Sequence, residues 1–346
     1  MDLRSLTLEE LKTDLAEHGE KAFRAGQIYD WVHKKCAASV EEMTNLSKQL
    51  RENLKEWYEF EEFEIARCQI SQIDGTRKYL FALSDGNMIE SVLMRYKHGN
   101  SVCISSQVGC RMGCAFCAST LDGLVRNLTA GEMLGQIYRI EHDTGERVAN
   151  VVVMGSGEPM DNFDNIVKFI GMLTDKNGLN ISQRNITVST CGLVPRMKEL
   201  AEKQFQITLA LSLHATTDER RRTLMPIANR YSIEELMEAC KYYFDKTGRR
   251  ITFEYSLVAG VNDSEEEATR LAALAGPVHA HVNLIPVNPI KERSFLPSDQ
   301  KRIRAFQNKL EKNGINVTIR REMGRDIDGA CGQLRRKVLE ESRDGE

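Results

Sequence analysis

The sequence predicts an α/β protein whose largest part is a partial (β/α)6 barrel. Three observations support this prediction. Apolar strands alternate with amphipathic helices after residue 101, the hydrophobic period changes from helical to two near residue 62, and 346 residues suffice for one large core with a smaller appendage. We therefore expect a helical accessory domain at 1–60, a β linker at 61–96, the barrel at 97–322 and a C-terminal segment at 323–346.

Residues 1–60 have the pattern of three short helices. Thr7-Leu-Glu-Glu10 is a capping box that begins the first helix, and the others are expected at 21–35 and 47–58. The second helix carries basic residues beside Phe23 and Trp31. Such a face can contact RNA or can be an ordinary solvated face over a small core, and the sequence alone favours the solvated face.

Residues 61–96 have the period of two that is typical of strands. The dipeptides Asp74-Gly75 and Asp85-Gly86 separate the apolar runs and are strong hairpin signals. We therefore expect a short antiparallel sheet with strands at 65–73, 77–83 and 88–95.

The segment after residue 101 repeats a strand followed by a helix. Capping boxes begin helices after Thr129 and Ser232. Repeated βα units form parallel sheets with right-handed connections, and six units are fewer than the eight of a closed TIM barrel. The sequence therefore predicts a partial TIM-like barrel with strands at 102–105, 151–154, 186–189, 207–211, 251–257 and 282–285.

Three thiols lie within eight residues, at Cys110, Cys114 and Cys117. So short a loop turns its sulfurs to one point when they share a ligand, and Gly113 gives the backbone freedom for that turn. A zinc site needs four ligands and would need a further thiol such as Cys103, whereas an iron-sulfur cubane held by three Cys leaves one iron open. The C-x3-C-x2-C spacing resembles that of the radical S-adenosylmethionine (SAM) superfamily, whose open iron binds SAM, and this favours the cluster.

Polar residues follow the ends of the predicted strands, where barrels of this kind carry their catalytic residues. Glu158, in a glycine-rich turn, offers a carboxylate suited to an ammonium group. Ser189, Ser212 and Asn288 can bond a ribose or a carboxylate, although strand-end Ser and Asn are often only helix caps. His214 lies on the same rim, although a lone His is more often a core residue.

Cys331 lies beyond the last predicted strand, 317–320, among glycines and carboxylates. A structural thiol normally lies in an apolar run, so we expect the backbone around Cys331 to approach a substrate. Nine cysteines are an odd number, and in a reducing compartment such a count indicates metal binding and redox chemistry rather than disulfides. We expect buried, inert thiols at Cys36, Cys68, Cys240 and, beside the SAM site, Cys191.

The composition is that of an ordinary globular protein, with 41% hydrophobic and 28% charged residues. The sequence has no apolar run as long as a membrane span, and its first residues lack the features of a signal peptide, so a cytoplasmic protein is expected. The net charge of -3 gives no overall case for a nucleic-acid partner. Any RNA must therefore be bound by local patches.

Several longer motifs, in order along the chain, resemble those of the RlmN family of dual-specificity RNA methyltransferases, within the radical SAM superfamily. The similarity extends from the helical N-terminal domain to Leu334. Besides the thiol loop, the motifs are Cys103-Ile-Ser-Ser-Gln-Val-Gly-Cys110, Met154-Gly-Ser-Gly-Glu-Pro159, Ser212-Leu-His214, Asn283-Leu-Ile-Pro-Val-Asn-Pro289 and Asp326-Ile-Asp-Gly-Ala-Cys-Gly-Gln333.

The resemblance implies a methyltransferase that acts on carbon 2 of adenosine-2503 in 23S rRNA and of adenosine-37 in some tRNAs. Carbon 2 of adenine is electron-poor, so a radical is required, and two SAM are used per turnover, one as methyl donor and one as radical source. Cys110, Cys114 and Cys117 would hold a [4Fe-4S] cluster. The residues implied to bind SAM are Gly157, Glu158, Ser189, Ser212, Leu213, His214 and Asn288.

The resemblance also implies roles for two further thiols and one carboxylate. Cys331 would accept a methyl group on sulfur, lose a hydrogen atom to the 5'-deoxyadenosyl radical and attack the adenine. Cys103 would then resolve the covalent adduct by forming a disulfide with Cys331. Glu90 matches the family's proton acceptor, although strand alternation alone would make it an exposed carboxylate.

The implied partners are 23S rRNA, tRNA and an electron donor such as flavodoxin or ferredoxin, and the implied state is a monomer. RNA is expected to meet basic residues at 220–222, 320–321 and 335–337. One alternative is a Cfr-like enzyme that methylates carbon 8 of the same rRNA adenosine, but Glu158-Pro159 favours carbon 2 because the Cfr pattern has Ala after the Glu. The other is a non-catalytic RNA-binding protein with a structural zinc.

Overall fold

The computed structural model describes residues 1–60, 63–288, 295–328 and 332–344. In this part of the chain ten strands form one sheet in the order β1-β2-β3-β4-β7-β8-β9-β10-β11-β12. Strands β1 to β4 pair antiparallel, and β4 pairs with β7 to begin a parallel half that continues to β12. The strands are β1 Glu64–Ile70, β2 Arg77–Ala82, β3 Met88–Tyr96, β4 Gly99–Ile104, β7 Val148–Val153, β8 Ile186–Thr190, β9 Thr208–Ser212, β10 Thr252–Leu257, β11 His281–Pro286 and β12 Val317–Ile319.

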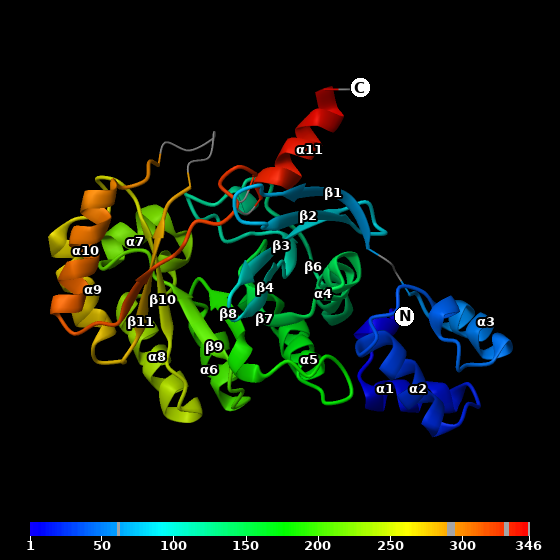
Figure 1. The fold of residues 1–346 in the computed structure, drawn as a ribbon. Helices are drawn as coiled ribbons and strands as arrows, with labels where there is room; N and C mark the ends of the chain where they lie inside the picture. Colours follow the sequence, from blue (N-terminus) through cyan, green and yellow to red (C-terminus); the bar gives the residue numbers. More distant parts are fainter. Residues whose placement is uncertain (61–62, 289–294, 329–331, 345–346) are drawn as a thin grey trace.

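The parallel half of the sheet curves into an open, partial barrel with helices on its outer side (Figure 1). Apolar side chains of the strands and helices, such as Val151, Phe169 and Leu211, pack into one buried cluster. The predicted fold class is confirmed, because all six predicted barrel strands are present, and the further strand predicted at 317–320 is found as the parallel strand β12. The helices of this part are α4 Ala130–Thr144, α5 Phe163–Leu173, α6 Val194–Glu202, α7 Asp218–Leu224, α8 Ile233–Thr247, α9 Glu265–Ala275 and α10 Gln300–Lys312.

The capping boxes predicted in the barrel begin two of these helices. At α4, the Thr129 hydroxyl accepts from the Glu132 N–H at 3.0 Å, and the Glu132 carboxylate accepts from the Thr129 N–H at 2.8 Å. Ser232 and Glu235 make the same reciprocal pair at α8. Local hydrogen bonds therefore fix where both crossover helices begin.

The N-terminal residues form three helices with their own apolar core, as the sequence predicts. The helices are α1 Leu8–Glu17, α2 Ala22–His33 and α3 Lys48–Trp57, and a short turn of 3-10 helix, η1 Leu3–Ser5, precedes them. They pack on the barrel through polar contacts as well: the Tyr29 hydroxyl donates to Asp175 at 3.1 Å, and His33 Nδ1 lies 2.9 Å from the Tyr138 hydroxyl. Phe23 on α2 is 57% exposed, so α2 does present an aromatic surface to solvent.

The antiparallel strands β1 to β3 lie beside the final helix, α11 Gln333–Asp344 (Figure 1). The strand predicted at 65–73 ends at Ile70 instead, because the next residues form a turn. There the Ser71 hydroxyl accepts from the N–H groups of Ile73 and Asp74 at 3.2 and 3.3 Å. Among the described residues, no helix is both long and apolar enough to cross a membrane.

Candidate active site

The thiol loop and the polar ends of the strands surround one cavity of about 260 Å³ at the C-terminal rim of the barrel. Every residue proposed for the cluster or for SAM lines it except Leu213, whose side chain is buried in the main core. The sequence-predicted residues that line it are Cys110, Cys114, Cys117, Gly157, Glu158, Ser189, Ser212, His214 and Asn288.

A hairpin positions the thiol loop. The strands β5 Gln107–Gly109 and β6 Leu124–Asn127 pair on either side of it, and the sequence analysis did not predict them. The Cys110 N–H donates to the Gly123 carbonyl at 2.9 Å, which closes the loop at its base. Gly113 has a φ of 70°, so the expectation that a glycine makes the turn is met.

Burial governs the protonation of the thiol loop. It raises the pKa of Cys110 to about 12, and the pKa of Cys114 rises further, so only a bound metal centre would make these sulfurs good thiolate ligands at neutral pH. In the described part of the chain no three His, Cys, Asp or Glu side chains gather closely enough to hold a single metal ion. A cubane spaces its thiolates more widely, because each binds a different iron. Three thiolates are one ligand short of a structural zinc site but suffice for a cubane with one open iron, so the donor set fits a cluster.

Glu158 is a buried carboxylate in the wall of the cavity. Its two oxygens accept from the N–H groups of Cys191 at 2.8 Å and Met160 at 3.1 Å, and burial raises its pKa. The glycine before it serves packing: a Cβ on Gly157, whose φ is 108°, would lie 2.7 Å from Gln107. Gly157 therefore lets this turn pack closely against the loop that carries Gln107, while the turn still lines the cavity.

His214 is held as a neutral ring. Its Nδ1 accepts from the Ser256 N–H at 2.9 Å, and because a backbone N–H can only donate, the ring proton is on Nε2. Burial, and then the charge of Arg221, lower its pKa to about 3. Its φ of 56° is rare for a residue with a side chain and marks a conformation fixed by its surroundings.

Ser189 and Ser212 end neighbouring parallel strands, β8 and β9. Their hydroxyl oxygens lie 3.3 Å apart at the edge of the cavity. Either hydroxyl can turn its hydrogen towards a ligand, because its oxygen can then accept the hydrogen bond that the other hydroxyl donates. The two side chains can therefore act as one adaptable polar pair.

Glu254 and Arg320 also line the cavity, and the sequence analysis missed both as site residues. Glu254 lies on β10, is buried with a raised pKa, and accepts from Asn283 at 2.9 Å. Glu254 is the only charged residue in the strand predicted at 251–257, and this is the signal that could have identified it. Arg320 was assigned to an RNA patch, but it lies between this cavity and the next.

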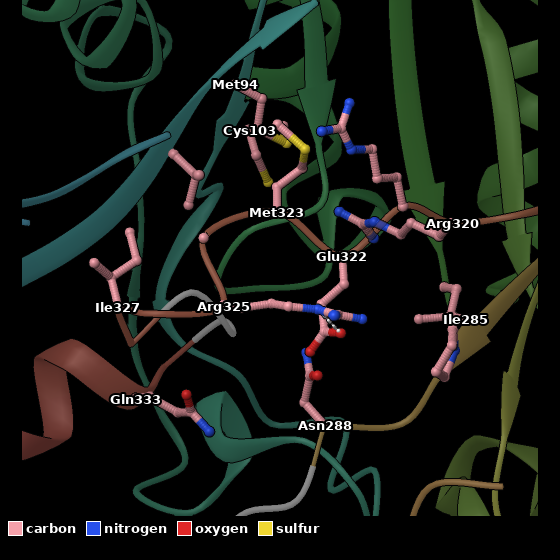
Figure 2. Close-up of a pocket in the computed structure, with 14 residues that line it drawn as sticks. Met94, Cys103, Ile285, Asn288, Arg320, Glu322, Met323, Arg325, Ile327 and Gln333 are labelled. Atoms are coloured by element: carbon pink, nitrogen blue, oxygen red, sulfur yellow. Dashed lines mark hydrogen bonds and ion pairs between the residues drawn. The ribbon is translucent and has the colours of Figure 1, made fainter. Parts of the chain in front are cut away.

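A second cavity, of about 320 Å³, adjoins the first. Cys103, which is buried on β4, lines it together with Met94 and with Met323 and Gln333 of the C-terminal segment (Figure 2). The two cavities share four lining residues, which are Ile285, Pro286, Asn288 and Arg320. Cys331, the other thiol with a proposed role, lies outside the described residues.

Glu90 lines neither cavity and is not the exposed carboxylate that strand alternation suggests. It is buried on β3 and forms an ion pair with Lys78 at 3.0 Å. It also accepts from the N–H groups of Gly332 at 2.6 Å and Arg335 at 2.7 Å, while Lys78 donates to the Asp328 carbonyl at 2.7 Å. The pair thus holds the C-terminal segment on both sides of residues 329–331.

The structure also bears on the basic run at 220–222 and on the four cysteines that were expected to be buried. Arg221 is fully buried, and Arg220 pairs with the buried carboxylate of Glu267. Two of the three arginines assigned to this RNA patch therefore interact within the protein. Cys68 is exposed on β1, where an alternating strand turns it to solvent, whereas Cys36 and Cys240 are buried as expected. Cys191 is the small buried residue that was expected beside the first cavity.

Comparison with known proteins gives the class of this chain. Residues 104–272 match the radical SAM superfamily, and residues 1–60 match the ribosomal RNA large subunit methyltransferase N-terminal domain. A radical SAM methyltransferase from Sphaerobacter thermophilus, known from its crystal structure, superposes with a TM-score of 0.93 at 44% identity, covering 96% of this chain and 98% of its own. The chain is therefore a radical SAM enzyme with an RNA-methyltransferase N-terminal domain.

Its particular family follows from two curated relatives. The probable dual-specificity RNA methyltransferase RlmN of Lachnospira eligens is 66% identical over 98% of this chain and 97% of its own length. The protein of the same name from Lachnoclostridium phytofermentans is 60% identical over 99% of this chain and 96% of its own. The chain belongs to the RlmN family of radical SAM RNA methyltransferases.

Proposed function

We propose that this enzyme methylates carbon 2 of adenosine-2503 in 23S rRNA and of adenosine-37 in some tRNAs. The observation that supports this best is the pair of adjoining cavities, one lined by the three thiols and the polar strand ends, the other by Cys103 and the C-terminal segment. One cavity can hold a SAM-binding centre while the other holds a base. Their shared wall brings the two reactants together.

In this proposal Cys110, Cys114 and Cys117 hold a [4Fe-4S] cluster, and Glu158 accepts from the ammonium group of SAM. When bound, the cluster would pass an electron to SAM, which would make SAM a source of radicals, and a donor such as flavodoxin or ferredoxin would supply that electron. The Ser189 and Ser212 hydroxyls, the Nε2–H of His214 and the amide of Asn288 offer the other polar contacts. Leu213 can contribute only backbone groups, since its side chain faces the core.

Three further residues act on the substrate in this proposal. Cys331 carries the one-carbon unit on its sulfur, Cys103 resolves the adduct, and Glu90 accepts the proton that leaves the adenine. A Cfr-like reaction at carbon 8 is the second candidate, because it would use the same cluster and the same two thiols. Glu158-Pro159 favours carbon 2 over it.

Nucleoside analysis tests the proposal directly. The full-length protein, loaded with iron and sulfide under anaerobic conditions, is incubated with a reductant, SAM and either 23S rRNA or tRNA. We expect 2-methyladenosine, identified by its elution and mass beside standards of 2-methyladenosine and 8-methyladenosine. The Cys114→Ala control should give neither product. A product that co-elutes with 8-methyladenosine would establish the Cfr-like reaction, and a colourless wild-type protein that binds zinc instead of iron would overturn the whole proposal.

We predict that Glu158→Gln weakens SAM binding about ten- to a hundredfold and leaves the iron and sulfide content unchanged. A hydrogen bond to a charged partner contributes about 1.5–3 kcal/mol, and the neutral amide gives up that charge. Anaerobic equilibrium dialysis with labelled SAM measures the effect. Asp164→Asn, an exposed carboxylate on α5, is the matched control. Equal SAM affinity in both variants would remove Glu158 from the site.

A further inference from the structure

A buried arginine adjoins the thiol loop. Arg221, on α7, is fully buried and donates hydrogen bonds to three backbone carbonyls: Cys191 at 2.6 Å, Leu213 at 3.2 Å and Ser212 at 3.3 Å. These carbonyls belong to the ends of β8 and β9, at the first cavity. Three residues further on, the Leu224 carbonyl accepts from the Ala115 N–H of the thiol loop at 2.8 Å. Helix α7 therefore connects the thiol loop with the SAM side of the cavity.

Carbonyl groups do not neutralise the charge of this arginine. Within the described residues, Arg221 forms no ion pair, and its Nη1 has no hydrogen-bond partner although it is buried. A buried cation is costly unless an anion lies near it. Burial lowers the pKa of Arg221, and negative charge on Cys191, on Cys114 or on the Asp218 carboxylate would raise it again.

The anion that would suit this position is a cluster bound by thiolates. Cys114 packs with Cys191 and Leu224 in a small apolar group of its own, so little water lies between the loop and α7 to screen a charge. A three-thiolate [4Fe-4S] centre is negative and becomes more so when it takes up an electron. A fixed positive charge beside it stabilises the reduced form more than the oxidised form.

We propose that Arg221 is a positioning residue whose buried charge raises the reduction potential of the cluster. Its three bonds hold the ends of β8 and β9, and its charge favours transfer of one electron from the reductant to the cluster. This inference rests on the proposed function, because it requires the cluster to be present. The proposed role belongs to Arg221 and not to its neighbour Arg222, which is exposed.

The test is a redox titration of the reconstituted full-length protein, monitored by the electron paramagnetic resonance of the reduced cluster. We expect Arg221→Gln to lower the ratio of reduced to oxidised cluster about tenfold at a given applied potential, a shift of about 59 mV to more negative values. Arg222→Gln, the matched control, should titrate like the wild type. Arg221→Lys, which keeps a positive charge but not the fork of donors, should stay closer to the wild type than Arg221→Gln does.

Other results of the titration would overturn the proposed role of Arg221. An unchanged potential in Arg221→Gln, or the same shift in Arg221→Lys, would show that the arginine only ties the strand ends together and would overturn the proposal. If Arg221→Gln takes up no iron, Arg221→Met replaces it, since a methionine fills the space without leaving a polar group to satisfy. Failure of the wild type itself to take up iron and sulfide would refute the proposed function, and the iron content reveals that before any titration.

Discussion

Cys103→Ala is expected to accumulate protein covalently attached to RNA, whereas Cys331→Ala is expected to be inactive and to show no adduct. If Cys331 carries the carbon to the base, the intermediate joins protein and RNA through a sulfur–carbon bond. The Cys103 thiolate attacks the Cys331 sulfur, a disulfide forms and the sulfur–carbon bond breaks. Its electron pair leaves with the carbon, which becomes the methyl group after taking a proton, and a thiol reductant restores the two cysteines.

Described residues on both sides of Cys331 lie at the cavity that Cys103 lines. Cys103 lines the second cavity together with Ile327 and Gln333, which flank the segment that carries Cys331. A denaturing gel after nuclease treatment, with mass mapping of the attached peptide, measures the adduct. Cys68→Ala, which removes an exposed thiol outside both cavities, is the control and should turn over normally. An adduct on a residue other than Cys331, or full turnover by Cys103→Ala, would contradict the mechanism.

Lys78→Met is expected to lower the free energy of unfolding by about 3–5 kcal/mol, the cost of removing one partner of a buried ion pair. The Lys78 side chain is completely buried, so its loss leaves Glu90 without its cation and deprives the Asp328 carbonyl of a donor. Chemical denaturation measures the change. The segment that carries Cys331 should also become more accessible to proteases, because its hold on β2 and β3 is weakened.

Arg67→Met is the matched control for this prediction. Arg67 also joins the antiparallel strands to the C-terminal helix, through Glu341 at 2.8 Å, but both side chains are exposed. Such a surface pair contributes about 1 kcal/mol or less. The double variant Lys78→Met with Glu90→Leu should recover much of the lost stability, since no charge then remains buried. A Lys78→Met protein as stable as Arg67→Met would show that the buried pair does not hold the segment.

The sequence was informative where chemistry depends on short spacing. The thiol loop and the Glu158 turn are continuous motifs, and the rule that functional residues follow the strands of such barrels was enough to bring Ser189, Ser212 and Asn288 to one cavity. Helix beginnings were equally local, because a capping box uses residues only three apart.

Burial and pairing that depend on residues distant in the sequence could not be predicted in the same way. Arg221 looks like part of a basic surface run in Arg220-Arg221-Arg222, and only the packing of α7 against two strand ends shows that it is buried. Lys78 and Glu90 lie on adjacent strands, and their pairing depends on the register between β2 and β3. The tautomer of His214 depends on Ser256, 42 residues away in the sequence. Such properties follow from tertiary neighbours rather than from residue type.

If SAM binds in the first cavity and the target base in the second, as proposed, the wall that the cavities share would couple the binding of SAM to the binding of RNA. Asn288 and Arg320 line both cavities. A ligand in one cavity that orders these two side chains therefore lowers the conformational entropy that a ligand in the other cavity must still lose. Linkage requires that the factor by which SAM changes the affinity for RNA equals the factor by which RNA changes the affinity for SAM. Loss of either side chain should therefore reduce cooperativity between the ligands as well as the affinity for each.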